Sequence, residues 1–283
     1  MPSVQWFPGH MHAAQKKILS ALKNVDLILE LLDARCPLAS QNPMIAQFLK
    51  NRQKPILKLL NKADLADSNQ NQLWCDFFNQ LPQTRAILTN AHHPKDVLNA
   101  LKVAKTLAPH RGSALKPLRM MVLGVPNVGK STFLNALAKR KIAQTGDVPA
   151  LTRAIQRIDV SPSLILLDTP GLMWHKIETS EAGFCLSCIN TIGVNAFDVM
   201  ETALFLADFL KKNHRLVFSK RYAFDVDIND SADGILEKIA QSRLTKQKGG
   251  VLDIEKAAHI LLLDFKTLAL GKISLESPPT CKN

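Results

Sequence analysis

Short apolar runs alternate with segments of helical periodicity over the first 170 residues of the chain. Runs that are nearly all apolar are typical of strands buried on both faces of a parallel sheet. Such strands are expected at residues 25–32, 56–60, 86–88, 120–123, 155–160 and 164–167. Helices are expected at residues 10–22, 43–49, 69–80, 96–107 and 130–138. This alternation predicts an α/β fold with an open, mostly parallel sheet and helices on both faces.

From about Thr179 the pattern changes to helical periodicity, with no convincing strands. Helices are expected at residues 198–210, 235–240 and 254–263. We therefore predict two domains, an α/β domain at residues 1–178 and an all-α domain at residues 179–283.

Composition and charge narrow the class of protein. Of the 283 residues, 46% are hydrophobic and 21% are charged, which is ordinary globular usage and excludes a disordered, collagen-like or disulfide-stapled chain. No apolar run is long enough to span a bilayer, and residues 1–5 lack the basic-then-apolar layout of a signal peptide. The protein is therefore expected to act in the cytoplasm without a membrane partner.

The formal net charge is +12, and the whole excess lies before residue 175. Dense basic segments occur at residues 50–58 and 139–141. A nucleic acid fits this distribution better than a membrane surface, because phosphate neutralisation rewards many dispersed Lys and Arg contacts. The alternative for any one cluster is an ordinary solvated surface.

Five cysteines in a chain without an export signal indicate reduced thiols. Cys185 and Cys188 form a lone C-x-x-C. A structural zinc site would need a second pair of ligands at short spacing, and none is evident downstream, so zinc or redox chemistry is not the favoured interpretation.

A phosphate-binding motif follows the expected strand at 120–123. Residues 124–131 read G-V-P-N-V-G-K-S, which matches G-x-x-x-x-G-K-[ST] between a strand and a helix. In such a loop the backbone N–H groups wrap the phosphates, Lys130 reaches the β and γ phosphates, and the Ser131 hydroxyl ligates Mg²⁺. The candidate nucleotide-binding residues are Asn127, Val128, Gly129, Lys130, Ser131 and Thr132.

A second phosphate-side motif, D-T-P-G at residues 168–171, follows the strand at 164–167. Asp168 is placed to hold Mg²⁺ from its outer shell, and Gly171 to present its N–H to a γ phosphate. Thr152, in the loop before the strand at 155–160, has a hydroxyl that would complete the magnesium shell. The predicted metal residues are therefore Ser131, Thr152 and Asp168.

A base-reading motif, N-K-A-D at residues 61–64, follows the strand at 56–60. The Asp64 carboxylate can accept hydrogen bonds from guanine N1–H and the exocyclic amine, whereas adenine offers no such pair, so GTP is predicted over ATP. Asn61 and Lys62 would brace the base. Asn90 and Ala91, after the next strand, lie where a second guanine-contacting loop is needed, although the sequence there departs from the commoner S-A-K. The alternative is that N-K-A-D is only a polar turn.

The base-reading motif precedes the phosphate-reading one. In this order the chain resembles the circularly permuted GTPases of the YlqF/RbgA type, which are bacterial ribosome-assembly factors. The resemblance rests on motifs spread over nearly the whole chain: W-F-P-G-H-M at 6–11, D-A-R at 33–35, N-P-M-I at 42–45, N-K-A-D, G-V-P-N-V-G-K-S-T, T-G-D at 145–147, D-T-P-G, and the glycines at 249–250 and 271.

The resemblance implies a circularly permuted P-loop GTPase domain followed by a helical domain that contacts rRNA. It implies a Mg²⁺-dependent GTP hydrolase that binds the precursor of the large ribosomal subunit, both rRNA and ribosomal proteins, and promotes its late maturation. We expect a monomer off the ribosome, with turnover stimulated by the subunit. The permutation brings the segment after D-T-P-G close in sequence to the helical domain, so nucleotide state can be transmitted as domain motion.

Leu172 stands where many GTPases place a water-orienting Gln, and an aliphatic side chain cannot position water. The resemblance points to His10 as the catalytic group, beside Lys130 and Thr152; the alternatives are that His10 caps a helix or touches RNA. Asn127 resembles the P-loop Asn of potassium-activated GTPases, which suggests K⁺ near the phosphates. Arg153 is a further candidate for charge stabilisation, but P-A-L-T at 149–152 departs from the common P-G-x-T.

Two other functions are weighed against this one. A tRNA-modifying or other RNA-processing factor that uses GTP as a switch would need its own chemical site, and the lone C-x-x-C is the only hint of one. An RNA-binding scaffold that holds GTP without cycling is disfavoured by intact Lys130, Thr152 and Asp168.

Overall fold

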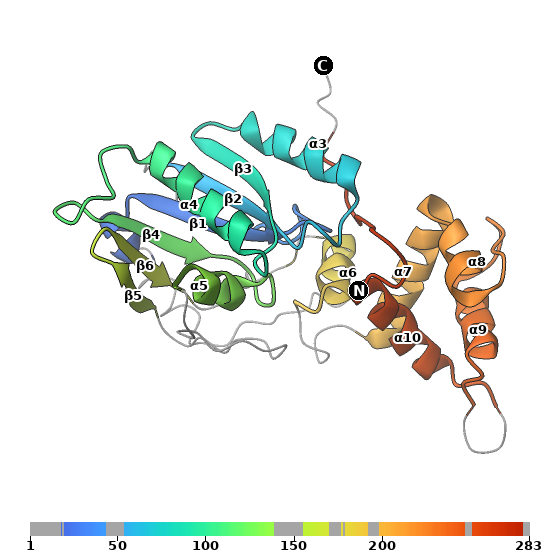
Figure 1. Cartoon of the computed structure of the whole chain (residues 1–283). Coiled ribbons are helices and arrows are strands. Elements are labelled where there is room, and N and C mark those ends of the chain that lie inside the picture. The colour runs from blue at the N-terminus through green and yellow to red at the C-terminus, as the bar shows by residue number, and fades with distance from the viewer. Residues whose placement is uncertain are drawn as a thin grey trace.

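The computed structural model describes residues 18, 20–43, 54–138, 155–169, 177, 179–191, 198–246 and 251–279. Its first part is built on one six-stranded sheet of order β3-β2-β1-β4-β6-β5, in which only β5 is antiparallel to its neighbour (Figure 1). The strands are β1 (Leu27–Asp33), β2 (Ile56–Asn61), β3 (Thr84–Thr89), β4 (Leu118–Leu123), β5 (Gln156–Ser161) and β6 (Leu164–Asp168). The predicted α/β class with a mostly parallel sheet is confirmed.

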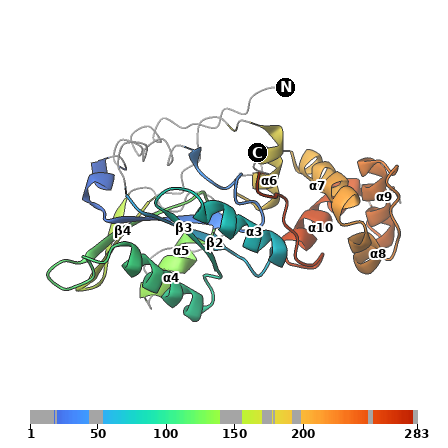
Figure 2. The same ribbon diagram turned by 90° about the horizontal axis from the view of Figure 1, so that it is seen from above.

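The central strand β1 is buried over its whole length, as its unbroken apolar run predicted. Successive side chains of a strand point to opposite faces, so one run serves two cores. Leu29 and Leu31 pack into the larger core with helices α4 (Pro94–Leu107) and α5 (Lys130–Ala138). Leu32 packs on the other face, in a core formed with α3 (Ser68–Asn79). Figure 2 shows α4 and α5 together on one side of the sheet.

In the described part of the chain after the sheet, five helices lie beyond the carboxyl ends of the parallel strands (Figure 1). They are α6 (Ser180–Cys188), α7 (Val199–Asn213), α8 (Leu216–Tyr222), α9 (Ala232–Ser242) and α10 (Ile254–Lys266). Side chains at the N-caps fix where several of them begin: Asp198 accepts from two backbone N–H groups of α7, and Ser231 accepts from the Gly234 N–H. Helix α10 packs on α7 and α9 to form the core of this unit.

After α10 the chain returns to the sheet-bearing part. The backbone N–H of Leu275 donates to the Arg35 carbonyl at 2.7 Å, and that of Ile273 donates to the Leu65 carbonyl at 3.3 Å. The Trp74 indole N–H of α3 donates to the Glu276 carbonyl at 3.3 Å. The last described residues therefore hold the loop after β1 and the loop after β2 together.

The expected elements match the observed ones wherever they can be compared, except at two helices. Helices α6 and α8 were not among those predicted. The first expected helix, at 10–22, and the second, at 43–49, lie mostly outside the described residues. Within the described part of the chain, no helix is long and apolar enough to cross a membrane.

Candidate functional site

The phosphate motif forms the turn between the central strand β4 and helix α5, which begins at Lys130. Gly129 has φ of 98°, and a Cβ placed on it would lie 2.3 Å from the side-chain nitrogen of Asn61. Gly124 is equally constrained, because its Cβ would lie 2.7 Å from the Leu31 carbonyl oxygen of the neighbouring strand. Close approach therefore requires glycine at both positions, and Gly129 is the one that lies against the base motif.

Asn61, at the end of β2, joins three loops through one amide. Its Nδ2 donates to the Val128 carbonyl at 2.7 Å, and its Oδ1 accepts from the Ala91 N–H at 2.9 Å. The side chain is buried, so its donor and acceptor are satisfied by the protein rather than by water. Asn61 thus holds the loop after β3 and the P-loop in a fixed relation.

Lys62 makes the second link between the base motif and the P-loop. It adopts a left-handed backbone, with φ of 58°. Its Nζ donates to the Asn127 carbonyl at 2.7 Å and lies 3.1 Å from Oδ2 of Asp33. Two motifs that are 65 residues apart in sequence are thereby in direct contact.

Asp64 and the loop after β3 face the space beyond these links. Asp64 is exposed, as a carboxylate that reads a ligand must be. The loop is held by hydrogen bonds of its own: the Asn90 side-chain oxygen accepts from the His92 N–H, and the Asn90 N–H donates to Asp96, both at 2.9 Å. The Ala91 N–H is already used by Asn61.

These residues line one cavity of about 520 Å³, within the size range of small-ligand sites. Its lining comes from the P-loop and from the loops after β2 and β3: Asn61, Lys62, Asp64, Leu65, Asn90, Ala91, His92, Asn127, Gly129, Lys130, Ser131 and Thr132. Val128 lies beneath it and contributes its carbonyl to Asn61. The structure therefore brings the predicted phosphate-side and base-side residues into a single cavity.

Lys130 carries the main positive charge of the phosphate end. Burial lowers the pKa of its ammonium, and the nearby Asp168 carboxylate partly offsets this. Asp168 ends β6 and is paired in register with Val122 of β4, so it lies directly beside the P-loop strand. Thr169 anchors the chain there, because its hydroxyl donates to the Val122 carbonyl at 2.7 Å. The P-loop end of the site therefore combines the Lys130 ammonium with the buried Asp168 carboxylate.

The same end of the site suits Mg²⁺. Ser131 lines the cavity with a hydroxyl, and the buried carboxylate of Asp168 ends β6, beside the P-loop strand β4. Mg²⁺ prefers such oxygen ligands, few in number and completed by waters and substrate phosphates. No group of three or more His, Cys, Asp or Glu side chains that could hold a metal occurs among the described residues.

Three predicted site residues, His10, Thr152 and Gly171, lie outside the described residues. The same holds for Leu172 and Arg153. Their assignments stay predictions.

Sequence reasoning missed the residues that surround the predicted ones. In the sequence, Asp33 and Arg35 stand out only as part of the D-A-R motif, yet their side chains form a buried ion pair beside Lys62. Asn190, in the loop after α6, accepts a hydrogen bond through its carbonyl from the Asn127 side chain at 2.5 Å. The only signal for the first pair was an Asp placed directly after a buried strand, and a backbone carbonyl gives no signal at all.

Cys185 and Cys188 are buried in α6 and belong to the larger core. Burial raises the pKa of both thiols, to about 12 for Cys188. They pack as apolar side chains in this structure.

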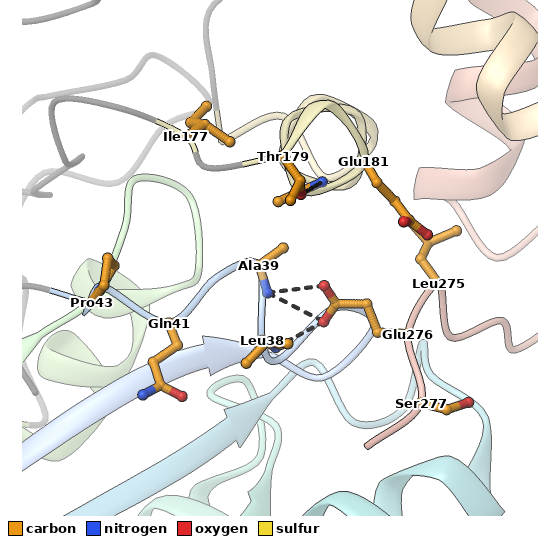
Figure 3. A pocket seen from close by; sticks show the side chains of 11 residues that line it. Leu38, Ala39, Gln41, Pro43, Ile177, Thr179, Glu181, Leu275, Glu276 and Ser277 are labelled. Carbon is orange, nitrogen blue, oxygen red and sulfur yellow. Dashed lines mark hydrogen bonds between the residues drawn. The ribbon is translucent and has the colours of Figure 1, made fainter. Parts of the chain in front are cut away.

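A second cavity, of about 490 Å³, lies where the C-terminal segment meets the loop after β1 and the start of α6 (Figure 3). Glu276 enters this junction, and its carboxylate accepts from the N–H groups of Leu38 at 2.8 Å and Ala39 at 2.9 Å. Burial raises the pKa of Glu276 to about 7 against the lowering effect of these hydrogen bonds, and Glu181 of α6 adds to the rise.

The chain is similar to known proteins in both sequence and fold. Residues 119–222 match the family model described as 50S ribosome-binding GTPase. The chain is 36% identical to Ribosome biogenesis GTPase A of Bacillus licheniformis, over 97% of this chain and 98% of that protein. It is 30% identical to Mitochondrial ribosome-associated GTPase 1 of Mus musculus, over 98% of this chain and 92% of that protein. Among solved structures it is similar to GDP-bound TM YlqF, with a TM-score of 0.65, 26% identity and coverage of 93% of this chain and 99% of that one.

Proposed function

The chain belongs to the ribosome biogenesis GTPase A family and is a GTP hydrolase with a circularly permuted GTPase fold, and from this premise we propose that it binds the precursor of the large ribosomal subunit and hydrolyses GTP on that particle. The observation that carries the proposal is the joining of N-K-A-D to the P-loop in one cavity, through Asn61 and Lys62. The large subunit is proposed because the matching family model is described as 50S ribosome-binding.

In the proposed site each residue has one task. Asp64 accepts from the guanine base, Asn61 and Lys62 hold the base loop, and Asn90 and Ala91 close its far side. Asn127, Val128, Gly129, Lys130, Ser131 and Thr132 wrap the phosphates, and Gly171 presents its N–H to the γ phosphate. Ser131, Thr152 and Asp168 hold Mg²⁺, which would neutralise charge on the transferred phosphate when bound.

His10 is proposed to orient the attacking water, because Leu172 cannot do so. Lys130 and Thr152 act with it, at the phosphate and at the metal. We also propose K⁺ as an additional positive charge near Asn127. In this structure the Asn127 side chain donates to the Asn190 carbonyl, so the loop after α6 already touches the residue that would face that ion.

The proposed domains, residues 1–178 for GTPase chemistry and 179–283 for rRNA contact, are supported by where cations gather in the second part. A hollow of about 640 Å³ at the turn between α7 and α8 is lined by Lys212, Arg215 and Lys220 among others. Leu216 in the same turn is 70% exposed. Cations gathered at one hollow suit the phosphate backbone of an RNA.

The test is GTP hydrolysis by the purified protein, in K⁺ and in Na⁺, with large subunits, with small subunits and with neither. We expect large subunits to raise turnover at least about tenfold, as expected when a partner completes a GTPase site. Small subunits are the control for a nonspecific effect of ribosomal RNA, because they are polyanions of the same chemistry. His10→Ala should retain GTP binding and lose the stimulation, and Lys130→Ala should lose turnover altogether.

Each outcome has a distinct meaning. Equal turnover with and without large subunits would refute subunit-coupled hydrolysis and favour a GTP-switched RNA-processing factor. Stimulation that survives in His10→Ala would refute only the catalytic role of His10. Equal rates in K⁺ and Na⁺ would remove K⁺ from the site.

A further inference from the structure

A buried carboxylate at the end of β1 contacts Lys62 but is not among the residues that line the nucleotide cavity. Asp33 is fully buried, and both of its oxygens are occupied. Arg35 donates to Oδ1 through Nε and to Oδ2 through Nη2, each at 2.8 Å, and the Arg35 N–H also donates to Oδ1 at 3.1 Å. This bidentate interaction fixes the orientation of the Asp33 carboxylate.

Lys62 approaches the same carboxylate from the nucleotide cavity. Its side chain is 26% exposed, but its Nζ lies between Oδ2 of Asp33 at 3.1 Å and the Asn127 carbonyl at 2.7 Å. Asp33 is therefore a single anion shared by two cations. Burial by itself would favour the neutral acid, but the charges of Arg35 and Lys62 and the hydrogen bonds from Arg35 outweigh it and hold the pKa of Asp33 well below its usual range.

We propose that Asp33 is a positioning residue for guanine-nucleotide binding, which acts by fixing the Lys62 ammonium against the P-loop carbonyl of Asn127 while Arg35 keeps its carboxylate oriented. The inference rests on the proposed assignment of N-K-A-D to the base. Without Asp33 two cations would face one another in a buried site, so Lys62 would leave the P-loop carbonyl. The P-loop and the base loop would then lose one of their two side-chain links.

Residues of α10 and of the segment after it contact Arg35 of the same ion pair. The Arg35 guanidinium lies 5.2 Å from the ring centroid of Phe265 in α10, and the Arg35 carbonyl accepts from the Leu275 N–H at 2.7 Å. Arg35 is thus held by the C-terminal part of the chain while it orients a group that touches the P-loop. This makes the ion pair more than a local cap on β1.

A second buried ion pair across the same two strands supplies a matched control. Glu30 pairs in register with Lys58, just as Asp33 pairs with Asn61, and Lys58 donates to Glu30. Lys58 also lies 4.9 Å over the Phe78 ring of α3, so this pair occupies the face of the sheet away from the P-loop. Glu30→Gln removes the same charge at the same depth without touching the proposed link.

The experiment is a double-mutant cycle read by titration of the full-length protein with a fluorescent GDP analogue. Asp33→Asn and Lys62→Met should each weaken binding about tenfold, the scale of one lost charge-assisted hydrogen bond. The double variant should bind within about twofold of Lys62→Met, because Asp33 acts through Lys62. Glu30→Gln should bind within about twofold of the unaltered protein. Additive losses in the double variant, or an equal loss in Glu30→Gln, would overturn the inference.

Two further arms keep the test decisive. If Asp33→Asn does not fold, as judged by circular dichroism, the cycle is run with Asp33→Glu, which keeps the charge but changes the distance to Lys62. Additive losses of affinity in Asp33→Glu and Lys62→Met would again overturn the inference.

The cycle is also run in the Asp64→Asn protein with a xanthosine diphosphate analogue, where Asp33→Asn should weaken binding by the same factor. If the unaltered protein does not bind GDP, the proposed base site fails; if it binds GDP and Asp33→Asn binds equally well, only this inference fails.

Discussion

Gly129 and Asn61 lie so close together that a single methyl group does not fit between them. A Cβ on Gly129 would meet the Asn61 side-chain nitrogen at 2.3 Å, and that nitrogen is the donor to the Val128 carbonyl. The glycine of the phosphate motif and the asparagine of the base motif therefore constrain each other, although they are encoded far apart in the chain.

Gly129→Ala should abolish tight nucleotide binding. The new methyl would push Asn61 away and break its hydrogen bond to the P-loop, and misplacing a binding loop by about 1 Å lowers function by about 100-fold. Isothermal titration with GDP measures the effect. Gly112→Ala is the control, because Gly112 has nearly the same φ, 96°, but nothing within 4 Å of the added Cβ. Equal loss of affinity in the two variants would show that backbone strain, and not the contact with Asn61, is responsible.

Asp64→Asn should change the base that is bound. A carboxylate accepts two hydrogen bonds from guanine, whereas an amide presents one donor and one acceptor, which match the C2 carbonyl and N1–H of xanthine. We expect affinity for GDP to fall and affinity for xanthosine diphosphate to rise, each by about tenfold or more. Competition titrations measure the ratio. A variant that loses both nucleotides equally would indicate that Asp64 supports the loop and does not read the base.

Lys130→Met should separate stability from activity. Burial lowers the pKa of Lys130, as expected for an ammonium group that is partly withdrawn from water. Replacing it with a neutral side chain of similar length should leave the Tm of the nucleotide-free protein unchanged or higher. Stabilisation by added GTP and Mg²⁺ should disappear, and turnover should fall by about 100-fold or more. Thermal unfolding with and without nucleotide tests both parts, and a lower Tm without nucleotide would contradict the first.

Glu276→Gln should change how stability depends on pH. The pKa of Glu276 is raised to about 7 from an ordinary 4.5, so the folded chain binds this proton more tightly than the unfolded chain does. Its contribution to the free energy of unfolding therefore falls as pH rises from about 4.5 to about 7, by on the order of 3 kcal/mol. Relative to the unaltered protein, the Gln variant should gain stability as pH rises through this window.

His214 titrates in the opposite sense, because burial lowers its pKa and makes stability rise with pH, so only the difference between the two proteins isolates Glu276. Urea unfolding at a series of pH values gives that difference. Glu181→Gln is the control, since Glu181 is exposed and adds only a secondary rise to the pKa of Glu276. Parallel pH profiles for Glu276→Gln and the unaltered protein would contradict the assignment.

Much of the fold could be predicted because its signals are local. Consecutive apolar positions predict the strand at 56–60. The P-loop motif predicts the helix at 130–138, because that motif requires a helix after it. The two missed helices lack such signals. Helix α8 has 7 residues, too few to show a helical period, and α6 buries Gly183, Cys185, Leu186 and Cys188 around much of its surface, which hides its amphipathic pattern.

The sequence by itself determined the types of chemistry, because a P-loop, an N-K-A-D segment and a D-T-P-G segment each carry their function in a few adjacent residues. Only the tertiary structure decided how they meet. The Lys62 contact with the P-loop spans 65 residues, the Asn127 contact with Asn190 spans 63, and the Glu276 contact with Leu38 spans 238. Such pairs depend on the order of the strands and on the path of the chain after α10. A backbone carbonyl acceptor or a shared carboxylate gives no signal in the local sequence. For that reason Asp33 became recognisable as a shared counter-ion only once β1, β2 and β4 were placed side by side.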